Sequence, residues 1–319
     1  MLRPNKDRPR PAPKEKHFFE YYSKFLKKKG VIMRVANKTV YDMIKYNLGN
    51  ITEDLNQANK VVSTGKRISD LSDDPVGLTQ ALNIRSALSN FEQLGRNINM
   101  GKFWLTASES AMSNVQVLIS DAHTLCVQMA TATIGAAERA SASETVQNTL
   151  DEVISLANTE LNGRYVFSGS KSDTVPFSQD GTYNGDNNPF TVKIGRDAAV
   201  QVGSDGEAAF GNIFTTLSDL KDALAANDVN GIQIAMGELD AHFDHVSNKI
   251  SDIGSKMVRM EIKENIFQDL KISNTERLSK IEDADIVEAI MDLKAKELAY
   301  QAALASSAKV MEMSLVDYM

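Results

Sequence analysis

Ile286-Val-Glu-Ala-Ile290-Met-Asp-Leu293-Lys-Ala-Lys-Glu297-Leu-Ala-Tyr300 is the stretch of sequence that decides the fold. Apolar residues recur in it at alternating steps of four and three, which is the spacing of a coiled-coil seam with polar interruptions. We therefore predict one helix over residues 286–315, about 45 Å long at about 1.5 Å per residue, with Asp285 as its N-cap. The row continues through Leu304, Ser307, Met311 and Ser314.

The leading segment carries a matching row, formed by Leu48, Ile51, Leu55, Ala58 and Val62. We predict a helix over residues 40–64 that Gly65 ends in a left-handed conformation. A lone helix with such a seam is marginal in water, so each terminal helix needs a partner. We expect the two ends of the chain to pair, with everything else folded between them.

The composition favours a large helical protein without covalent staples. The 319 residues allow two or three domains. The single cysteine, Cys126, cannot form an intramolecular disulfide. No run of about 18 apolar residues is present, which argues against a transmembrane helix.

Residues 1–32 differ in charge from the rest of the chain. They hold ten Lys or Arg against three acidic residues, whereas the remainder holds twenty-five basic and thirty-nine acidic residues. Such a basic segment could bind nucleic acid or anionic lipid. Because Met33 opens a segment of quite different character, we expect instead that residues 1–32 are disordered or are sequence read from an upstream start.

The middle of the chain changes character twice. Asp74 can cap a second helix with Pro75 at its first position, and a helical pattern continues to about residue 162. The next fifty residues are rich in Val and Phe, and Asn184-Gly185 is a hairpin signal. The helical pattern then resumes. The apolar rows of the helical parts are Ile98, Leu105, Met112, Ile119 and Cys126; Ala111, Val115, Leu118, Ala122, Leu125 and Met129; and Val246, Ile250, Ile253, Met257 and Met260.

We therefore predict a mainly α fold with a small β insert, in which the N- and C-terminal segments form a long antiparallel helical bundle or coiled coil. The expected domains are a basic extension (1–32), a terminal coiled-coil assembly domain (33–72 with 283–319), a helical bundle (73–165 with 213–282) and a central β insert (166–212).

Three candidate sites have simpler explanations. His242 and His245 lie one helical turn apart beside two aspartates, but no motif supplies a third zinc ligand, so a solvated helix face is preferred. Residues 180–188 faintly resemble a calcium loop but lack its glutamate. Residues 163–170 are neither a P-loop nor a dinucleotide fingerprint. We predict no catalytic residues, no cofactor and no metal.

Two short stretches resemble the signatures of the flagellin superfamily of bacterial flagellar axial proteins. The amino-terminal one is Ser63-Thr-Gly-Lys-Arg-Ile68 followed by Ser72-Asp-Asp-Pro-Val-Gly77. The carboxy-terminal one is Ile281-Glu-Asp-Ala-Asp285. The two together are specific, and the resemblance covers residues 33–319.

Within the superfamily, the chain is more similar to the hook-associated branch than to filament flagellins. Pro75 follows Asp-Asp where flagellins tend to have alanine. Residues 164–169 leading to 175–177, the start near Met33 and the ending Ser314-Leu-Val-Asp-Tyr-Met319 indicate the same branch. A filament flagellin with a short variable domain is the alternative.

The resemblance implies a structural subunit of the extracellular flagellum and not an enzyme. It implies export by the flagellar type III apparatus, with an export chaperone and without a cleaved signal. The implied partners are further copies in a ring, another hook-associated protein and flagellin, with no nucleic acid and no membrane insertion. We expect the assembly interface to comprise Leu48, Ile51, Leu55, Val62, Ile290, Leu293, Tyr300, Leu304, Met311 and Leu315.

Overall fold

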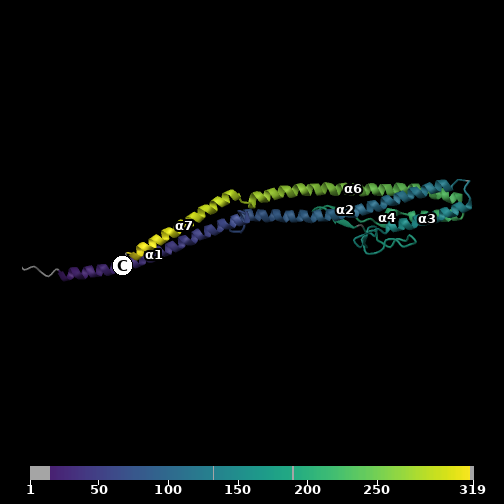
Figure 1. The fold of residues 1–319 in the computed structure, drawn as a ribbon. Helices are drawn as coiled ribbons and strands as arrows, with labels where there is room; N and C mark the ends of the chain where they lie inside the picture. The colour runs from purple at the N-terminus through teal and green to yellow at the C-terminus, as the bar shows by residue number, and fades with distance from the viewer. Residues whose placement is uncertain (1–14, 132, 189, 317–319) are drawn as a thin grey trace, which may run out of the picture. The chain divides into compact units, whose positions relative to one another are not determined.

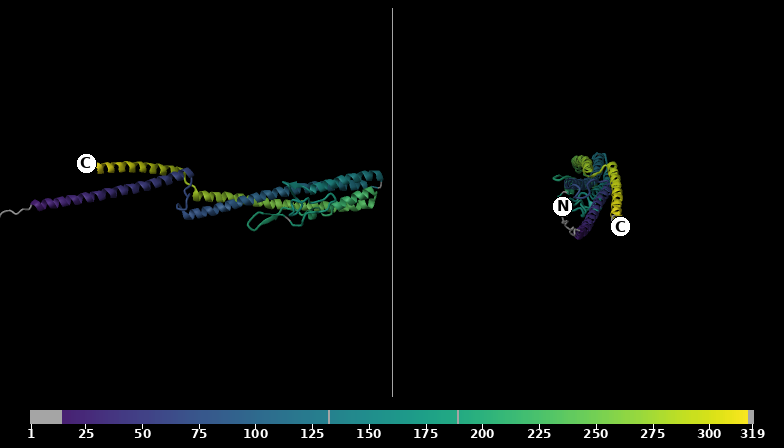
Figure 2. Two further views of the ribbon diagram at one scale, coloured as in Figure 1. Left: turned by 90° about the horizontal axis from the view of Figure 1, so that it is seen from below. Right: turned by 90° about the vertical axis from the view of Figure 1, so that its left-hand side faces the viewer.

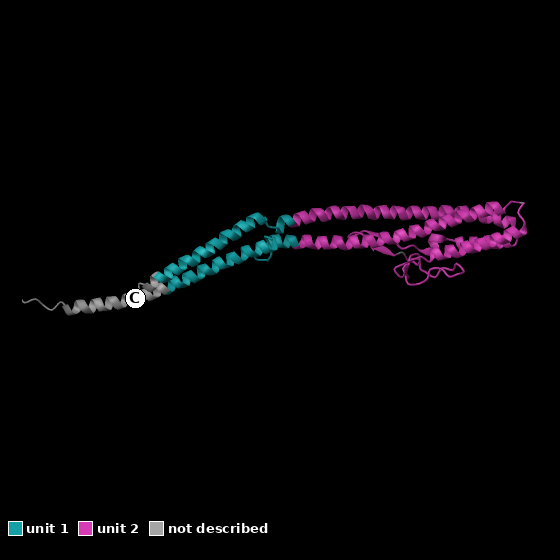
Figure 3. Ribbon diagram, in the orientation of Figure 1, with its two compact units in different colours: residues 1–81, 279–319 teal, residues 82–278 magenta. Residues whose placement is uncertain are grey.

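The computed structural model of the chain describes residues 15–131, 133–188 and 190–316, with side chains described from residue 38 to residue 312 within these ranges. The chain forms two compact units, coloured separately in Figure 3. Unit 1 comprises residues 1–81 and 279–319, and unit 2 comprises residues 82–278. The predicted mainly α class is confirmed, with short β strands confined to the middle of the chain.

Unit 1 is a pair of long helices joined to the rest by a turn-rich segment. Helix α1 (Glu15–Thr64) and helix α7 (Ile286–Val316) lie side by side in Figures 1 and 2 and run antiparallel. Helix α1 ends as predicted, because Gly65 has φ +68°. Residues 15–32, for which disorder or an upstream start was expected, belong to α1. Residues 1–14 lie outside the described part.

Unit 2 is a helical bundle. It is built from most of α2 (Pro75–Met129), α3 (Ala136–Ala157), the short α4 (Gly206–Phe210), α5 (Ile213–Ala225) and most of α6 (Val229–Glu282). The predicted start of α2 is confirmed, since Asp74 Oδ1 accepts hydrogen bonds from the amides of Val76 and Gly77 at 3.1 and 2.9 Å.

The helical pattern up to residue 162 is interrupted between α2 and α3, which the sequence did not predict. Arg139 is buried there and donates to the carbonyl oxygens of Met129 and Thr131, each at 2.9 Å. It also bonds the side chain of Asn227. The guanidinium thus satisfies carbonyl groups that the end of a helix leaves without partners. The contacts of Arg139 thus stabilise the turn, and Gly135 is the N-cap residue at which α3 begins.

The core of unit 2 uses the apolar rows that the sequence predicts. Ile98, Leu105, Met112, Ile119 and Cys126 recur every seven residues along α2 and are at most 1% exposed. The α6 row alternates between buried and partly buried positions: Val246, Ile253 and Met260 are buried, and Ile250 and Met257 pack against them. Residues seven apart lie on one face of a helix, so each of these rows faces the core of unit 2.

The β insert is less regular than predicted. Its strands are β1 (Glu160–Leu161) paired with β2 (Arg164–Tyr165), and β3 (Thr191–Lys193) paired with β4 (Ala199–Gln201), both antiparallel. A tight turn with positive φ at Asn162 (53°) and Gly163 (79°) joins β1 to β2. The expectation of a hairpin turn at Asn184-Gly185 is wrong, because neither strand pair turns there.

The insert has no core of its own. Its buried residues, among them Val166, Phe167 and Phe177, belong to the same apolar cluster as the helices of unit 2. The Phe167 and Phe210 rings meet edge to face with centroids 4.9 Å apart, and the Phe177 and Phe214 rings lie 4.7 Å apart. Aromatic contacts of this kind stabilise the fold beyond what the burial of their apolar area contributes. The insert is therefore held to α4 and α5 by shared packing.

Candidate assembly interface

The contact between α1 and α7 follows a seven-residue repeat. Ala58 on α1 is 6% exposed and Ala289 on α7 is 9% exposed. Farther along the pair, Ile44, Leu48 and Ile51 of α1 line a hollow together with residues of α7. An ion pair crosses the helices where Lys296 Nζ lies 3.2 Å from Asp54 Oδ2. The α7 residues that are less exposed than their neighbours are Ala289, Leu293, Lys296, Glu297, Tyr300, Ala303, Ser307 and Val310.

This row corrects the phase of the predicted α7 seam. The predicted row and the observed one share Leu293, Glu297, Tyr300 and Ser307, but other positions differ by one residue. Ala303 replaces Leu304 in the observed row, for example, and a step of one residue turns a helix by about 100°. Small residues such as Ala289 and Ala303 allow the two helices to approach closely. The face of α7 that is turned to α1 therefore carries fewer large apolar side chains than the predicted row.

The predicted interface residues fall into two groups. Leu48, Ile51, Leu55 and Val62 of α1, with Leu293 and Tyr300 of α7, are half-buried. Ile290, Leu304 and Met311 are exposed to 44%, 43% and 40%. The side chain of Leu315 lies outside the described residues. The first group lies in or beside the contact between the two helices. The second group is exposed and is available for contact with another molecule.

The helix pair exposes many further large apolar side chains. Single exposed apolar residues are ordinary, but a set concentrated on two adjacent helices marks an interaction surface. The exposed apolar residues of the pair are Val40, Tyr41, Met43 and Tyr46 on α1, and Ile286, Val287, Ile290, Met291, Leu298, Leu304 and Met311 on α7.

The structure brings the two sequence signatures together at the start of α7. The amide of Ala284 donates to the carbonyl of Gly65 at 2.9 Å, and the amide of Arg67 donates to the carbonyl of Glu282 at 2.7 Å. Lys66 pairs with Asp283 in an antiparallel β-bridge. The sequence identified both stretches but gave no reason to expect their contact.

A buried charge lies inside this bridge. The Glu282 side chain is 2% exposed, and its carboxylate lies 3.1 Å from Lys66 Nζ. A buried carboxylate must be compensated, and removing one partner of such a pair is costly. The second half of the amino-terminal signature is held locally, because Asp73 Oδ2 accepts the amides of Asp70 and Ser69 at 3.0 Å. These bonds, the one to Asp70 first, lower the pKa of Asp73.

The signature loop also packs tightly against the first turn of α2. Ile68 is 2% exposed. A Cβ atom added to Gly77 would lie 2.7 Å from Ile68 Cδ1, which real Cβ atoms do not tolerate. Gly77 therefore leaves room for the isoleucine. These contacts fasten the loop between α1 and α2 to the junction of α6 and α7, all within unit 1.

His242 and His245 of unit 2 have structural partners. His242 Nε2 lies 3.0 Å from Thr216 Oγ1, which itself donates to Glu238 at 3.0 Å. His245 Nε2 lies 3.0 Å from the carbonyl of Ala208. The preferred interpretation as a solvated helix face is therefore wrong, because both rings are half-buried against α4 and α5. Burial lowers the pKa of His242, against an opposing effect of Glu238.

One carboxylate of the segment weighed as a calcium loop is hydrogen-bonded to a serine outside that segment. Asp186 accepts from the amide of Ser170 at 2.7 Å and from its hydroxyl at 2.5 Å. Within the described residues, no three His, Cys, Asp or Glu side chains are grouped so as to hold a metal ion. In the same part of the chain, every helix is too short or too polar to cross a membrane.

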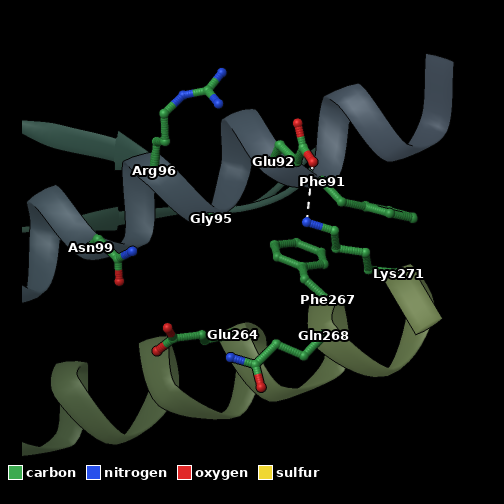
Figure 4. A pocket seen from close by; sticks show the side chains of 9 residues that line it. All are labelled: Phe91, Glu92, Gly95, Arg96, Asn99, Glu264, Phe267, Gln268 and Lys271. Atoms are coloured by element: carbon green, nitrogen blue, oxygen red, sulfur yellow. Dashed lines mark hydrogen bonds and ion pairs between the residues drawn. The ribbon is translucent and has the colours of Figure 1, made fainter. Parts of the chain in front are cut away.

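A hollow of about 330 Å³ in unit 2 lies between α2 and α6 (Figure 4). The Phe91 and Phe267 rings stack at one end with centroids 5.6 Å apart, and Lys271 Nζ lies 3.1 Å from Glu92 Oε1. The side chains of Arg96 and Asn99 point away from this stack in Figure 4. The hollow is an open groove between α2 and α6, and the residues that line it form no reactive constellation.

Comparison with known families agrees with this arrangement. The bacterial flagellin N-terminal helical region matches residues 35–172, and the bacterial flagellin C-terminal helical region matches residues 236–319. The two matched regions contain both halves of the helix pair and both signatures. The chain belongs to the bacterial flagellin family. Residues 1–34 precede the matched region.

Three similar proteins represent the relatives of this flagellin-family chain. Flagellar hook-associated protein 3 of Escherichia coli is 26% identical over 85% of this chain and 96% of its own length. A flagellin of Halalkalibacterium halodurans is 24% identical over 82% of this chain and 90% of its own length. The crystal structure of Bacillus cereus FlgL has a TM-score of 0.57 and 26% identity, covering 62% of this chain and 99% of that chain. The chain is a structural component of the bacterial flagellum.

Proposed function

We propose that this flagellin-family chain is the junction subunit between another hook-associated protein and the flagellin filament. The observation that supports the proposal most directly is the α1/α7 pair. It is held together by one narrow row of contacts, while large apolar side chains such as Tyr46 and Leu298, 68% and 67% exposed, face solvent. A surface of this kind is stable only when other subunits cover it.

The proposed assembly is a ring of identical copies in the extracellular flagellum, and it is not an enzyme. Its neighbours would be the hook-associated protein on one side and flagellin on the other. Export through the flagellar type III apparatus, assisted by a chaperone and without a cleaved signal, is part of the proposal. Nucleic-acid binding and membrane insertion are not part of the proposal. The similarity to hook-associated protein 3 over nearly the whole of both chains supports this role.

Complementation of a strain that lacks its hook-associated junction protein tests the proposal. The full chain should restore filaments attached to hooks. Without it, cells should bear bare hooks and release flagellin into the medium. If the chain is exported at normal levels and filaments still detach, the junction role is wrong.

A filament flagellin with a short insert is the second candidate, supported by the similarity to the H. halodurans flagellin over most of both chains. Abundance separates the two roles, because filament subunits greatly outnumber the subunits of one junction. Quantitative mass spectrometry of sheared flagella should find this chain at a small fraction of the flagellin level. Abundance equal to that of the main filament protein would favour the flagellin role.

A further inference from the structure

The first part of α1 carries a segment with a composition of its own. Residues 16–28 read Lys-His-Phe-Phe-Glu-Tyr-Tyr-Ser-Lys-Phe-Leu-Lys-Lys, with five aromatic residues and four lysines against one glutamate. They are helical, since α1 begins at Glu15. The match to the bacterial flagellin N-terminal helical region begins only at residue 35. The expectations drawn from that family therefore do not extend to this segment.

A helix separates the apolar and the charged positions of this segment. Successive residues of a helix are rotated by about 100°. Over residues 16–28 the apolar positions then fall within an arc of about 160°, and the lysines, the glutamate and His17 all fall outside that arc. Such a division is that of an amphipathic helix. The apolar positions are Phe18, Phe19, Tyr21, Tyr22, Phe25 and Leu26.

Helix α7 does not extend alongside this segment. The two helices run antiparallel, and Asp54 Oδ2 lies 3.2 Å from Lys296 Nζ. Val316, the last residue of α7, is twenty residues beyond Lys296, so it is level with residue 34 of α1, twenty residues before Asp54. Residues 16–28 therefore precede the part of α1 that α7 accompanies. Because an isolated amphipathic helix is marginal in water, this apolar face needs another surface to cover it.

The charge of the segment indicates which surface fits. Its four lysines and one glutamate give a formal charge of +3, with His17 neutral. Further copies of the chain would bring like charges together, whereas anionic lipid headgroups attract lysine side chains. Phe, Tyr and Leu on one face and Lys on the other are typical of helices that lie in a membrane interface. Nucleic acid is a poorer match, because proteins that bind single strands combine aromatic and basic residues in one groove.

We propose that residues 16–28 of α1 form a membrane-surface helix that binds anionic phospholipid. The helix would lie on the bilayer without crossing it, since thirteen residues of helix span only about 20 Å and the hydrocarbon core is about 30 Å thick. The binding does not depend on the junction role. A chain made in the cytoplasm meets the anionic cytoplasmic leaflet first, so this helix would hold the chain at the membrane before export.

Cosedimentation of the purified full-length chain with phospholipid vesicles tests the inference. Vesicles of equal parts phosphatidylcholine and phosphatidylglycerol should bind the chain at least about tenfold more tightly than vesicles of phosphatidylcholine alone. Raising NaCl from about 0.1 M to about 0.5 M should weaken this binding, because salt screens the lysines. Equal binding to the two kinds of vesicle, or binding to neither, would overturn the inference.

Two paired substitutions separate the contributions of the two faces. Phe18→Gln with Phe25→Gln removes apolar area without changing the charge. Lys24→Gln with Lys28→Gln removes charge from the opposite face. Each pair should weaken binding to the anionic vesicles at least about tenfold.

The matched control for the phenylalanine pair is Tyr41→Gln with Tyr46→Gln, farther along α1, where the side chains are 56% and 68% exposed. The control should bind the anionic vesicles within about twofold of wild type. If it weakens binding as much as the phenylalanine pair does, general adhesion of apolar residues on α1 causes the binding and the inference is wrong. Circular dichroism melts check that unit 2 remains folded in every variant.

Nucleic-acid binding is the alternative that the phenylalanine pair distinguishes. Duplex DNA of about 20 base pairs, added at the lower salt concentration, should displace little protein from the anionic vesicles. If only the lysine pair reduces vesicle binding and the duplex displaces the protein, the segment recognises polyanions in general and the lipid inference is overturned. The junction role stands in that case, because complementation of the null strain tests it separately.

Discussion

Helices α2 and α7 carry apolar rows with the same seven-residue repeat, but the two rows lie in different environments. In unit 2, the row from Ile98 to Cys126 is at most 1% exposed, because α2 is covered by other helices and by the β insert. In unit 1, Leu293, Tyr300 and Ser307 are only half-buried, because α7 packs chiefly against α1 in the part of the chain that the structure describes. A periodic row therefore specifies which face of a helix is buried, and the number of neighbours decides how completely.

The largest expected effect comes from placing a charge on the open face of unit 1. Leu304→Asp changes a side chain that is 43% exposed in the monomer. It should leave the melting temperature of the monomer unchanged and abolish filament attachment, since a carboxylate buried by neighbouring subunits costs several kcal/mol. Export of the variant with bare hooks and shed flagellin would be the observed phenotype.

Leu293→Asp and Asn187→Asp serve as comparisons for that variant. Leu293 is half-buried beside α1, so its substitution should also loosen the helix pair in the monomer, seen as faster hydrogen exchange in α1 and α7. Asn187 is exposed in the insert, and its substitution should allow normal swimming. Wild-type filaments in both leucine variants would show that the terminal helices are not the assembly surface.

The second prediction compares leucine truncation in the two units. Leu105→Ala removes a side chain that is 1% exposed and should lower the free energy of unfolding by about 2–5 kcal/mol. Leu293→Ala should cost clearly less, because that side chain is only partly buried. Urea denaturation followed by circular dichroism measures both. Equal losses would contradict the view that unit 1 is incompletely buried in the monomer.

The third prediction concerns the helix caps of unit 1. Asp74 Oδ1 accepts two amides at the start of α2, and Asp285 Oδ1 accepts the amide of Val287 at 2.9 Å at the start of α7. Replacing either with Ala should cost about 1 kcal/mol, measured by urea denaturation. Asp42→Ala, in the exposed middle of α1, is the control and should change stability little. A control as destabilised as the caps would exclude the capping explanation.

The smallest effect is a pH dependence in unit 2. Burial lowers the pKa of His242 from its ordinary value of 6.5. Above pH 6.5 the ring is neutral in both states and contributes no pH dependence. As the pH falls below 6.5, the unfolded chain binds the proton first, so the stability of unit 2 decreases until the folded pKa is passed.

His242→Gln should remove this component of the acid sensitivity. Thermal melts of the variant and wild type at pH 7 and pH 5 would measure it. Identical pH dependence in the two proteins would mean that other groups account for the loss.

Part of this fold could be predicted because it depends on neighbours in sequence. The end of α1 at Gly65, the caps at Asp74 and Asp285, the extent of α7 and the buried row of α2 all follow from local propensity and periodicity. The break in the helical pattern at Arg139 could not be found in this way, because its bonds reach the end of α2 and Asn227. Near residue 162 the sequence predicted only the end of the helical pattern, whereas the structure has a tight turn at Asn162-Gly163 between β1 and β2.

The sequence by itself determined that two helices at opposite ends of the chain each present an apolar face that needs covering, and it identified the two family signatures. Only the tertiary structure decided that α7 meets α1 through Ala289, Leu293 and Ala303, leaving Ile290 and Leu304 outward. It also decided that Gly65 and Ala284 join the two signatures through a backbone hydrogen bond. The physical reason is that helix periodicity is local, whereas the rotation of one helix against another depends on which side chains are small enough to allow close approach.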